Sequence, residues 1–460
     1  MAVRSFTLEE IAGITGGRVV RPAQGPIRGL CLDSRRASPS SLFAALKGQR
    51  VDGHDFAAAS IRSGAAAVLA EQEVELPEGA GLLVVPSVER AVEAIAIEIR
   101  SEFRGEVLGI VGSCGKTTTK DFSAAVLGRL GVVTATAGNR NNLLGLPETL
   151  MAADMQARFW VLEMGISHPS EMDVLAPLGS PTGVLFTNIQ PVHMEFFPSL
   201  EAIRDEKAKV LRRTDPHGFA IVNASDPLLA QMAIPEGMGR LTYGAQPGAE
   251  LWIEAAGSAG PEGTPFRLHD SLGSAEGFLP VPGLHNIINF AGACRAGLHY
   301  GLAIEECAAA AASLKAAPHR GQARLLRNQV LLFDDSYNAN PAAVVLALQT
   351  AAGWGRRVIG ALGSMLELGA GSIEHHRLVG ARAADLGLAC LLAVGGKEAE
   401  AMAEAFAASG RPCLHVESWQ DGAEWLDGQI RAGDGVLVKG SRGIGLDGLV
   451  AWLSGRRGEA

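Results

Sequence analysis

A glycine-containing loop with a lysine and three threonines is the part of this sequence best suited to chemistry. It follows the predicted strand Val107–Val111, which is rich in β-branched residues, and occupies residues 112–119. A loop between a strand and a helix presents successive backbone N–H groups, which together surround a polyphosphate. Lys116 would reach the outer phosphates and the Thr117 hydroxyl would bind Mg²⁺. The predicted phosphate cradle is Gly112, Ser113, Cys114, Gly115, Lys116, Thr117 and Thr118.

The strict Walker pattern fails here, because the position of its first glycine holds Ile110. The shorter pattern G-x-x-G-K-T-T remains. A chance glycine turn with a solvated lysine is the alternative. A strong strand before the loop and a helix after it favour nucleotide binding over that alternative.

Two further polar residues lie where parallel strands are expected to end. Glu163 closes the run Phe159–Leu162, and His193 follows the run Gly183–Thr187. A polyphosphate site needs such ligands, because Mg²⁺ must take up the charge that develops in phosphoryl transfer. Alone, a glutamate at a strand end is usually solvated, and a single histidine is usually structural. Beside the glycine loop, both become candidate metal ligands.

The elements that position these residues alternate along the chain. Apolar spacing predicts a helix over residues 88–103, and an alanine-rich helix is predicted over 304–315. Strands are predicted at 81–85, 107–111, 159–163, 183–187, 219–222, 330–333, 358–362, 390–394 and 435–438. Such alternation is typical of α/β domains with largely parallel sheets, whose ligands bind at the carboxyl ends of the strands.

Chain length and two prolines predict three domains. The 460 residues amount to about three units of roughly 150 residues. Pro86 stops a strand and Pro318 ends a helix, so the limits are placed at 1–85, 86–318 and 319–460. Apolar residues make up 47% of the chain, which is enough for sizeable cores.

Charge and composition exclude several classes of function. The net charge of −9 has the wrong sign for a protein whose main function is binding nucleic acid. The start of the chain is acidic, and no run of about 18 apolar residues occurs, so neither a signal peptide nor a membrane span is expected. A cytoplasmic monomer is predicted. Its six cysteines include no C-x-x-C pair, which favours free thiols.

The chain resembles the Mur ligase family over almost its whole length. The resemblance rests on strings whose order and spacing are specific together. They are D-S-R at 33–35, L-F-A-A-L-K-G at 42–48, D-G-H-D-F at 52–56, the glycine loop, T-A-G-N-R-N-N at 136–142, G-L-H-N-I-I-N at 283–289, D-D-S-Y-N-A-N-P at 334–341, M-L-E-L-G at 365–369 and K-G-S-R at 439–442. The strings at 334–341 and 365–369 favour the branch of the family that adds D-Ala-D-Ala.

The resemblance implies a small α/β N-terminal domain that binds a UDP-muramoyl peptide, a central P-loop ATPase domain and a Rossmann-like C-terminal domain. It implies that phosphate passes from ATP to the peptide carboxylate of UDP-N-acetylmuramoyl-tripeptide, after which D-Ala-D-Ala attacks the acyl phosphate in peptidoglycan precursor synthesis.

Two Mg²⁺ sites are expected from the resemblance, one at Thr117 and Glu163 and one at His193. Lys207 falls where the family carries a carbamoylated lysine, although charge pattern alone favours a surface lysine there. The catalytic set is Lys116, Glu163, His193 and Lys207.

Further roles are implied position by position. Asn286, Arg320 and Asp335 resemble nucleotide contacts. Substrate contacts are expected from Ser34, Arg35, Asn142, Asn338, Asn340, Lys439, Ser441 and Arg442. The sequence departs from the family at two places, with His319 before Arg320 where the family has glycine, and Ser364 where it commonly has aspartate.

Three alternatives stay open. A sibling Mur ligase would add an amino acid to a shorter UDP-muramoyl peptide. A folylpolyglutamate-synthase-like enzyme would share the glycine loop, and a non-catalytic protein would only bind nucleotides or UDP-sugar peptides. The residues do not distinguish diaminopimelate from lysine as the third residue of the tripeptide, nor an open from a closed arrangement of domains.

Overall fold

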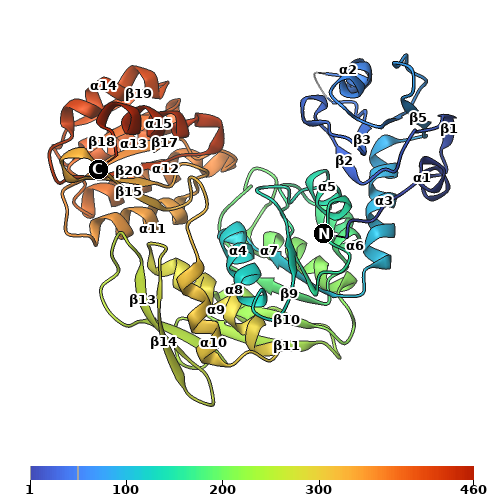
Figure 1. Ribbon diagram of the computed structural model, residues 1–460. Helices are drawn as coiled ribbons and strands as arrows, with labels where there is room; N and C mark the ends of the chain where they lie inside the picture. The colour runs from blue at the N-terminus through green and yellow to red at the C-terminus, as the bar shows by residue number, and fades with distance from the viewer. Residues whose placement is uncertain (1, 49–50, 460) are drawn as a thin grey trace.

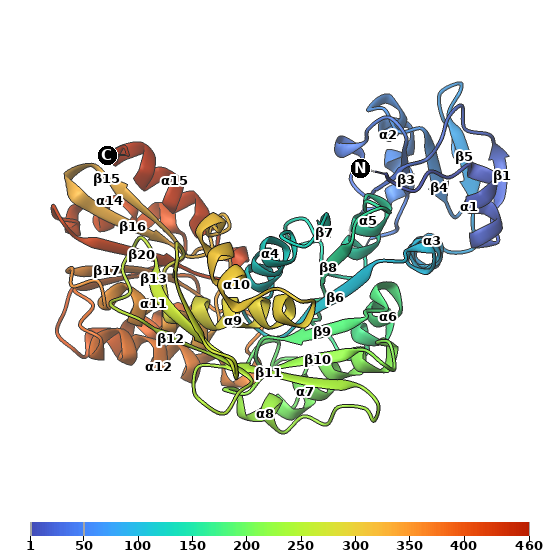
Figure 2. The ribbon, with the colours of Figure 1, turned by 60° about the horizontal axis from the view of Figure 1, so that its bottom comes forward.

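The computed structural model describes residues 2–48 and 51–459, which form three α/β units along the chain (Figure 1). Each unit is built on its own sheet. In both views the first and third units lie on opposite sides of the second (Figures 1 and 2). Among the described residues, every helix is too short or too polar to pass through a lipid bilayer.

The first unit has a five-stranded sheet in the order β1-β5-β4-β3-β2, parallel except for the β1–β5 pair. Its elements are α1 Leu8–Thr15, β1 Arg18–Arg21, β2 Gly29–Cys31, β3 Ser41–Ala44, α2 Ala57–Arg62, β4 Ala67–Ala70 and β5 Gly81–Val84. Thr7 begins α1 through a capping box, in which its hydroxyl accepts from the Glu10 N–H and the Glu10 carboxylate accepts from the Thr7 N–H.

The second unit has nine strands in the order β14-β13-β12-β11-β10-β9-β6-β8-β7. The strands from β12 to β7 are parallel, whereas β13 and β14 pair antiparallel at one edge. The strands are β6 Glu106–Val111, β7 Val133–Ala135, β8 Phe159–Glu163, β9 Gly183–Phe186, β10 Phe219–Asn223, β11 Gly239–Gly244, β12 Leu251–Ala255, β13 Thr264–His269 and β14 Ser274–Leu279. The helices are α3 Val88–Glu102, α4 Lys116–Leu127, α5 Gly145–Met151, α6 Glu171–Gly179, α7 Leu200–Ala208, α8 Pro227–Ala230, α9 Leu284–His299 and α10 Ile304–Ala310.

The third unit has six strands in the order β15-β16-β20-β17-β18-β19, parallel except for β15 with β16. The strands are β15 Gln322–Leu326, β16 Val330–Asp334, β17 Val358–Gly363, β18 Cys390–Val394, β19 Cys413–Val416 and β20 Gly435–Lys439. The helices are α11 Pro341–Ala352, α12 Ser372–Asp385, α13 Lys397–Ala407, α14 Trp419–Gln429 and α15 Leu446–Arg457.

The apolar cores are distributed unevenly among the three units. One continuous buried cluster runs from Leu42 and Leu83 of the first sheet through α3 to Trp160 of β8. The other face of the nine-stranded sheet has its own cluster around Phe290. Two further clusters cover the two faces of the third sheet.

The predicted strands of the second and third units are present within a residue or two of their expected bounds. The alanine-rich helix is shorter than predicted, because α10 ends at Ala310 and residues 311–313 form a 3₁₀ turn. The antiparallel strands β13 and β14 were not predicted, nor was β15. The domain limits after residues 85 and 318 stay predictions.

Candidate active site

A cavity of about 610 Å³ lies where the second and third units meet. The glycine loop and the carboxyl ends of β8 and β9 form one wall, and residues 320–346 with Lys439 form the other. The predicted site residues that line it are Ser113, Cys114, Gly115, Lys116, Thr117, Thr118, Asn142, Glu163, His193, Asn286, Arg320, Asp335, Asn338, Asn340 and Lys439. Residues from three separate predictions, the glycine loop, the strand ends and the third unit, therefore meet at one cavity.

The glycine loop is fixed to the end of β9. The Ser113 N–H donates to the Asn188 carbonyl at 2.8 Å, and the Cys114 N–H donates to the Asn188 side chain at 2.9 Å. Gly112 has φ +155°, and a Cβ built there would lie 1.9 Å from the Thr187 hydroxyl oxygen. Only glycine lets the loop approach β9 this closely. Because the N–H groups of Ser113 and Cys114 are bonded to Asn188, the N–H groups left for a phosphate are the next ones, at the start of α4.

Lys116 is held inside the loop that it belongs to. Its ammonium donates to the carbonyls of Gly112 and Ser113 at 2.9 and 3.0 Å. Burial lowers the pKa of Lys116, although the nearby carboxylate of Glu163 opposes that shift. The ammonium thus lies within the loop, where it could contact a phosphate that the loop binds.

Glu163 ends β8 and is 1% exposed. One carboxylate oxygen accepts from the Asn141 amide at 2.6 Å. The other oxygen, Oε2, is buried and has no hydrogen-bond partner among the described residues. A buried carboxylate oxygen without a partner is costly, and a cation bound in the cavity would supply one. Thr117 lines the same cavity, so a hydroxyl and an orphaned carboxylate oxygen are both available there, and this set of oxygen donors fits Mg²⁺.

His193 contacts the third unit. Its Nδ1 lies 2.5 Å from Oε2 of Glu367, which belongs to the loop after β17. Burial lowers the pKa of His193, although Glu367 opposes the shift. A neutral imidazole whose Nδ1 is engaged by a carboxylate offers Nε2 as a metal ligand.

Lys207 is buried in α7 and is 1% exposed, so it is not the surface lysine that its charge pattern favoured. Its ammonium makes no hydrogen bond or ion pair with the part of the chain that the structure describes. Burial lowers the pKa of Lys207 well below its ordinary value, and the charge of Lys116 lowers it further. Lys207 is not among the residues that line the cavity, although the charge of Lys116, which lines it, reaches Lys207.

The third unit contributes a network of side chains around β16 and β20. Lys439 pairs with Asp335 at 2.5 Å and also donates to the Asn338 carbonyl at 3.0 Å. Asn340 caps α11 with its amide oxygen and donates its amide nitrogen to Cys114 Sγ at 2.9 Å. Asn340 therefore bridges the third unit to the glycine loop.

Asn286 lies at the start of α9, where its amide donates to the Pro282 carbonyl at 2.6 Å. It accepts from the neighbouring Asn289, whose side chain lies within 2.8 Å of a Cβ built on Gly115. Asn286 is thus tied to the same region as the glycine loop. Asn142 lines the cavity while its side chain caps the backbone of Gly145.

Besides Gly112 and Lys207, four predicted site residues are not among those that line the cavity. Ser34 and Arg35 are in the first unit, where Arg35 pairs with Asp33 at 2.7 Å and is exposed. That pair lowers the pKa of Asp33 to about 2. Ser441 and Arg442 follow β20, where the Ser441 hydroxyl accepts from the Leu366 N–H and Arg442 contacts Asp447.

Three residues with defined contacts were not predicted. Asn141 and Glu367 lie within strings that the sequence singled out, but neither received a role. Asn188 fixes the glycine loop, and its position after a strand was the only available signal.

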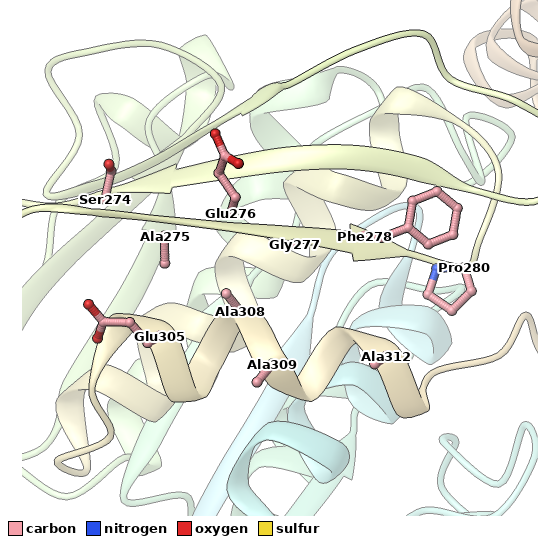
Figure 3. A pocket seen from close by; sticks show the side chains of 10 residues that line it. All are labelled: Ser274, Ala275, Glu276, Gly277, Phe278, Pro280, Glu305, Ala308, Ala309 and Ala312. Carbon is pink, nitrogen blue, oxygen red and sulfur yellow. The ribbon is translucent and has the colours of Figure 1, made fainter.

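A second hollow, of about 570 Å³, lies between β14 and α10 (Figure 3). Alanines and Phe278 form much of its lining, and its two carboxylates belong to Glu276 and Glu305. Glu276 is already paired with Arg267. The hollow lacks the convergent polar groups of the interdomain cavity, so the candidate active site is the latter.

Family models match the chain in three consecutive segments. The Mur ligase family catalytic domain matches residues 26–111, the Mur ligase middle domain 110–297, and the Mur ligase glutamate ligase domain 319–442. The UDP-N-acetylmuramoyl-tripeptide–D-alanyl-D-alanine ligase of Mycobacterium tuberculosis is 33% identical, over 97% of this chain and 98% of its own. The chain belongs to the Mur ligase family.

Solved Mur ligase structures share the whole fold. MurF from Acinetobacter baumannii superimposes with a TM-score of 0.88 at 27% identity, covering 98% of this chain and 99% of that one. MurF from Thermotoga maritima, in complex with ADP, has a TM-score of 0.79 at 26% identity, covering 92% and 96%. The predicted architecture of three α/β domains is confirmed for this Mur ligase.

Proposed function

We propose that this Mur ligase joins D-Ala-D-Ala to UDP-N-acetylmuramoyl-tripeptide at the expense of ATP, as a step in peptidoglycan precursor synthesis. The observation that carries this proposal is the interdomain cavity, where a phosphate-binding loop, an orphaned carboxylate oxygen and the third unit meet. The curated relatives named for this reaction match nearly the full chain.

The reaction divides into two transfers. A carboxylate oxygen of the tripeptide attacks the γ-phosphorus of ATP, and ADP leaves with the electron pair of the broken bond. The amine of D-Ala-D-Ala then attacks the acyl carbon and loses a proton, and phosphate leaves as the amide forms. Lys116 and the loop N–H groups hold the phosphates for the first transfer.

Two Mg²⁺ sites complete this proposal. Thr117 and Glu163 would hold the first, and His193 with Lys207 the second. When bound, Mg²⁺ offsets the repulsion between the triphosphate and the attacking carboxylate. Among the described residues, no three His, Cys, Asp or Glu side chains form a ready-made metal site. Phosphate oxygens and water would complete both coordination shells.

We propose that Lys207 carries a carbamate. Its lowered pKa favours the neutral amine, which is the form that attacks CO₂ and then loses a proton. The product has negative oxygens in place of an ammonium, so it would attract a cation where the unmodified lysine repels one.

The remaining assignments follow the layout of the three units. Ser34 and Arg35 of the first unit would bind the uridine diphosphate, since a guanidinium suits phosphate oxygens. Asn142 would contact the muramoyl end. Nucleotide contacts would come from Asn286, Arg320 and Asp335. Asn338, Asn340, Lys439, Ser441 and Arg442 would orient the tripeptide carboxylate and the dipeptide. A cytoplasmic location and a monomeric state stay predictions.

Phosphate release tests the proposed reaction. ATP turnover should require UDP-N-acetylmuramoyl-tripeptide and D-Ala-D-Ala together, and mass spectrometry should find the amide product. Turnover with a UDP-muramoyl-dipeptide and a free amino acid, but none with D-Ala-D-Ala, would instead assign the chain to a sibling reaction. Comparing tripeptides that end in lysine and in diaminopimelate then identifies the preferred substrate.

A further inference from the structure

His319 has an unusual backbone at the link between the second and third units. Its φ is +61°, in the left-handed region that favours glycine. Glycine is also what the family pattern has at this position. The next residue, Arg320, lines the active-site cavity. A side chain with a Cβ is strained in this conformation, so the surrounding structure must hold it there.

The imidazole of His319 contacts a fully buried carboxylate. Its Nδ1 lies 2.9 Å from Oδ2 of Asp334, which ends β16 and is 0% exposed. The other oxygen of Asp334 accepts from the Ser336 hydroxyl at 2.7 Å. Arg324 is a more distant partner of Oδ2, at 3.4 Å. Without the imidazole, that oxygen would retain only this long contact.

The backbone of His319 is fixed from the same strand end. Its carbonyl accepts from the Tyr337 N–H at 3.0 Å. The guanidinium of Arg320 in turn stacks over the Tyr337 ring, 3.9 Å from its centre. Arg320 is near enough to Lys116 that its charge helps to lower the pKa of that lysine. The two cations therefore lie on the same part of the cavity, one from each unit.

We propose that His319 is a positioning residue, whose contact with Asp334 fixes the interdomain link so that Arg320 is held toward the phosphates of the bound nucleotide. The proposal rests on the proposed function, because it needs a nucleotide in this cavity. A glycine would adopt the backbone conformation but could not reach Asp334. The left-handed backbone alone would favour glycine at this position, and the contact with Asp334 is what the imidazole adds.

Nucleotide binding by three variants at this position separates the backbone from the side chain. ADP with Mg²⁺ is titrated into each protein by calorimetry. His319→Gly keeps the backbone and loses the contact, and it should weaken ADP binding about tenfold, as expected when a positioned group moves. His319→Asn tolerates the left-handed backbone and can donate to Asp334, so its affinity should return to within about threefold of the wild type. His319→Asp places a like charge beside Asp334 and should bind more weakly than His319→Asn.

Arg324→Gln is the matched control, because it removes the other partner of Asp334 Oδ2 without changing the link itself. It should bind ADP like the wild type. Equal affinities for the wild type and His319→Gly would overturn the proposal. If the glycine variant does not fold, the asparagine and aspartate variants decide, and equal affinities for those two would also overturn it.

A double-mutant cycle tests whether His319 acts through Arg320. Arg320→Ala should weaken ADP binding, and adding His319→Gly to it should change the affinity by less than about twofold. If the losses of ADP affinity in the two single variants instead multiply in the double variant, His319 acts independently of Arg320 and the proposal is rejected. The KM for UDP-N-acetylmuramoyl-tripeptide should stay constant while the KM for ATP rises. Failure of the wild type itself to bind ADP would reject the proposed function instead.

Discussion

The two oxygens of the Glu163 carboxylate are in different situations. One is paired with Asn141, and the other is buried without a partner among the described residues. The paired oxygen fixes the orientation of the group, whose residue lines the cavity, and leaves the other oxygen available to a bound cation. A preorganised anion of this kind stabilises a bound cation without rearrangement.

Replacing Glu163 with glutamine should therefore abolish most of the activity while keeping the shape of the site. The amide can still accept from Asn141 but carries no charge for Mg²⁺. We expect kcat for phosphate release to fall by about a hundredfold or more. Glu276→Gln, in the second hollow, is the control and should retain wild-type turnover. Wild-type turnover by Glu163→Gln would exclude Glu163 as a metal ligand.

Local sequence predicted those site residues whose position follows from one strand and the loop after it. Lys116, Thr117 and Glu163 are of this kind, because a strand end and its loop are neighbours in sequence. The contact between His193 and Glu367 joins residues 174 apart. No local pattern contains that contact, because only the packing of two units against each other creates it.

Among the structural elements, the loop after β17 depends on a histidine in α12. His376 is 0% exposed, its Nε2 accepts from the Met365 N–H at 2.8 Å, and its Nδ1 bonds to the Ser372 carbonyl. Burial lowers the pKa of His376 below its ordinary value of 6.5. A neutral ring thus holds the loop that carries Glu367.

Acid should destabilise the protein partly through this ring. Above pH 6.5, His376 is neutral in the folded and unfolded chains, and its contribution is complete. As the pH falls through that value, the unfolded chain takes up a proton that the folded chain does not, so the free energy of unfolding decreases. His376→Gln should lose less stability than the wild type between pH 7 and pH 5 in denaturant titrations. His217→Gln, at an exposed histidine of the second unit, should follow the wild type, and identical acid sensitivity in all three proteins would contradict this role.

Strands with continuous apolar runs were predictable, and strands without them were not. β8 and β10 are buried on both faces, so each reads as an unbroken apolar segment. β13 alternates between buried and half-exposed residues, and β15 is mostly half-exposed. β15 lies at the edge of its sheet and β13 lies next to an edge, where burial is one-sided and the apolar signal is weak.

At the scale of the whole molecule, two side-chain contacts among the described residues join the second and third units across the cavity, beside a backbone bond from the Glu195 N–H to the Glu367 carbonyl. Glu367 meets His193, and Asn340 meets Cys114 of the glycine loop. Both contacts engage residues of the proposed catalytic machinery. The position of the third unit is therefore coupled to the geometry of the phosphate and metal sites.

Glu367→Gln should weaken the second metal site by loosening this coupling. We expect the Mg²⁺ concentration for half-maximal turnover to rise about tenfold or more, as for other partners of metal-binding histidines. The readout is a Mg²⁺ titration of phosphate release, together with Mn²⁺ binding in the presence of ADP. Glu374→Gln, an exposed residue paired with Arg377, serves as the control. An unchanged Mg²⁺ requirement would separate Glu367 from the metal site.

The uneven apolar cores make the molecule mechanically asymmetric. One cluster runs without interruption from the first sheet into the second unit, whereas the third sheet keeps its clusters to itself. We therefore expect the free protein to unfold on heating or in denaturant as two cooperative blocks rather than three. A nucleotide bound as proposed, against both sides of the cavity, would join these blocks, so its binding energy would make them unfold together.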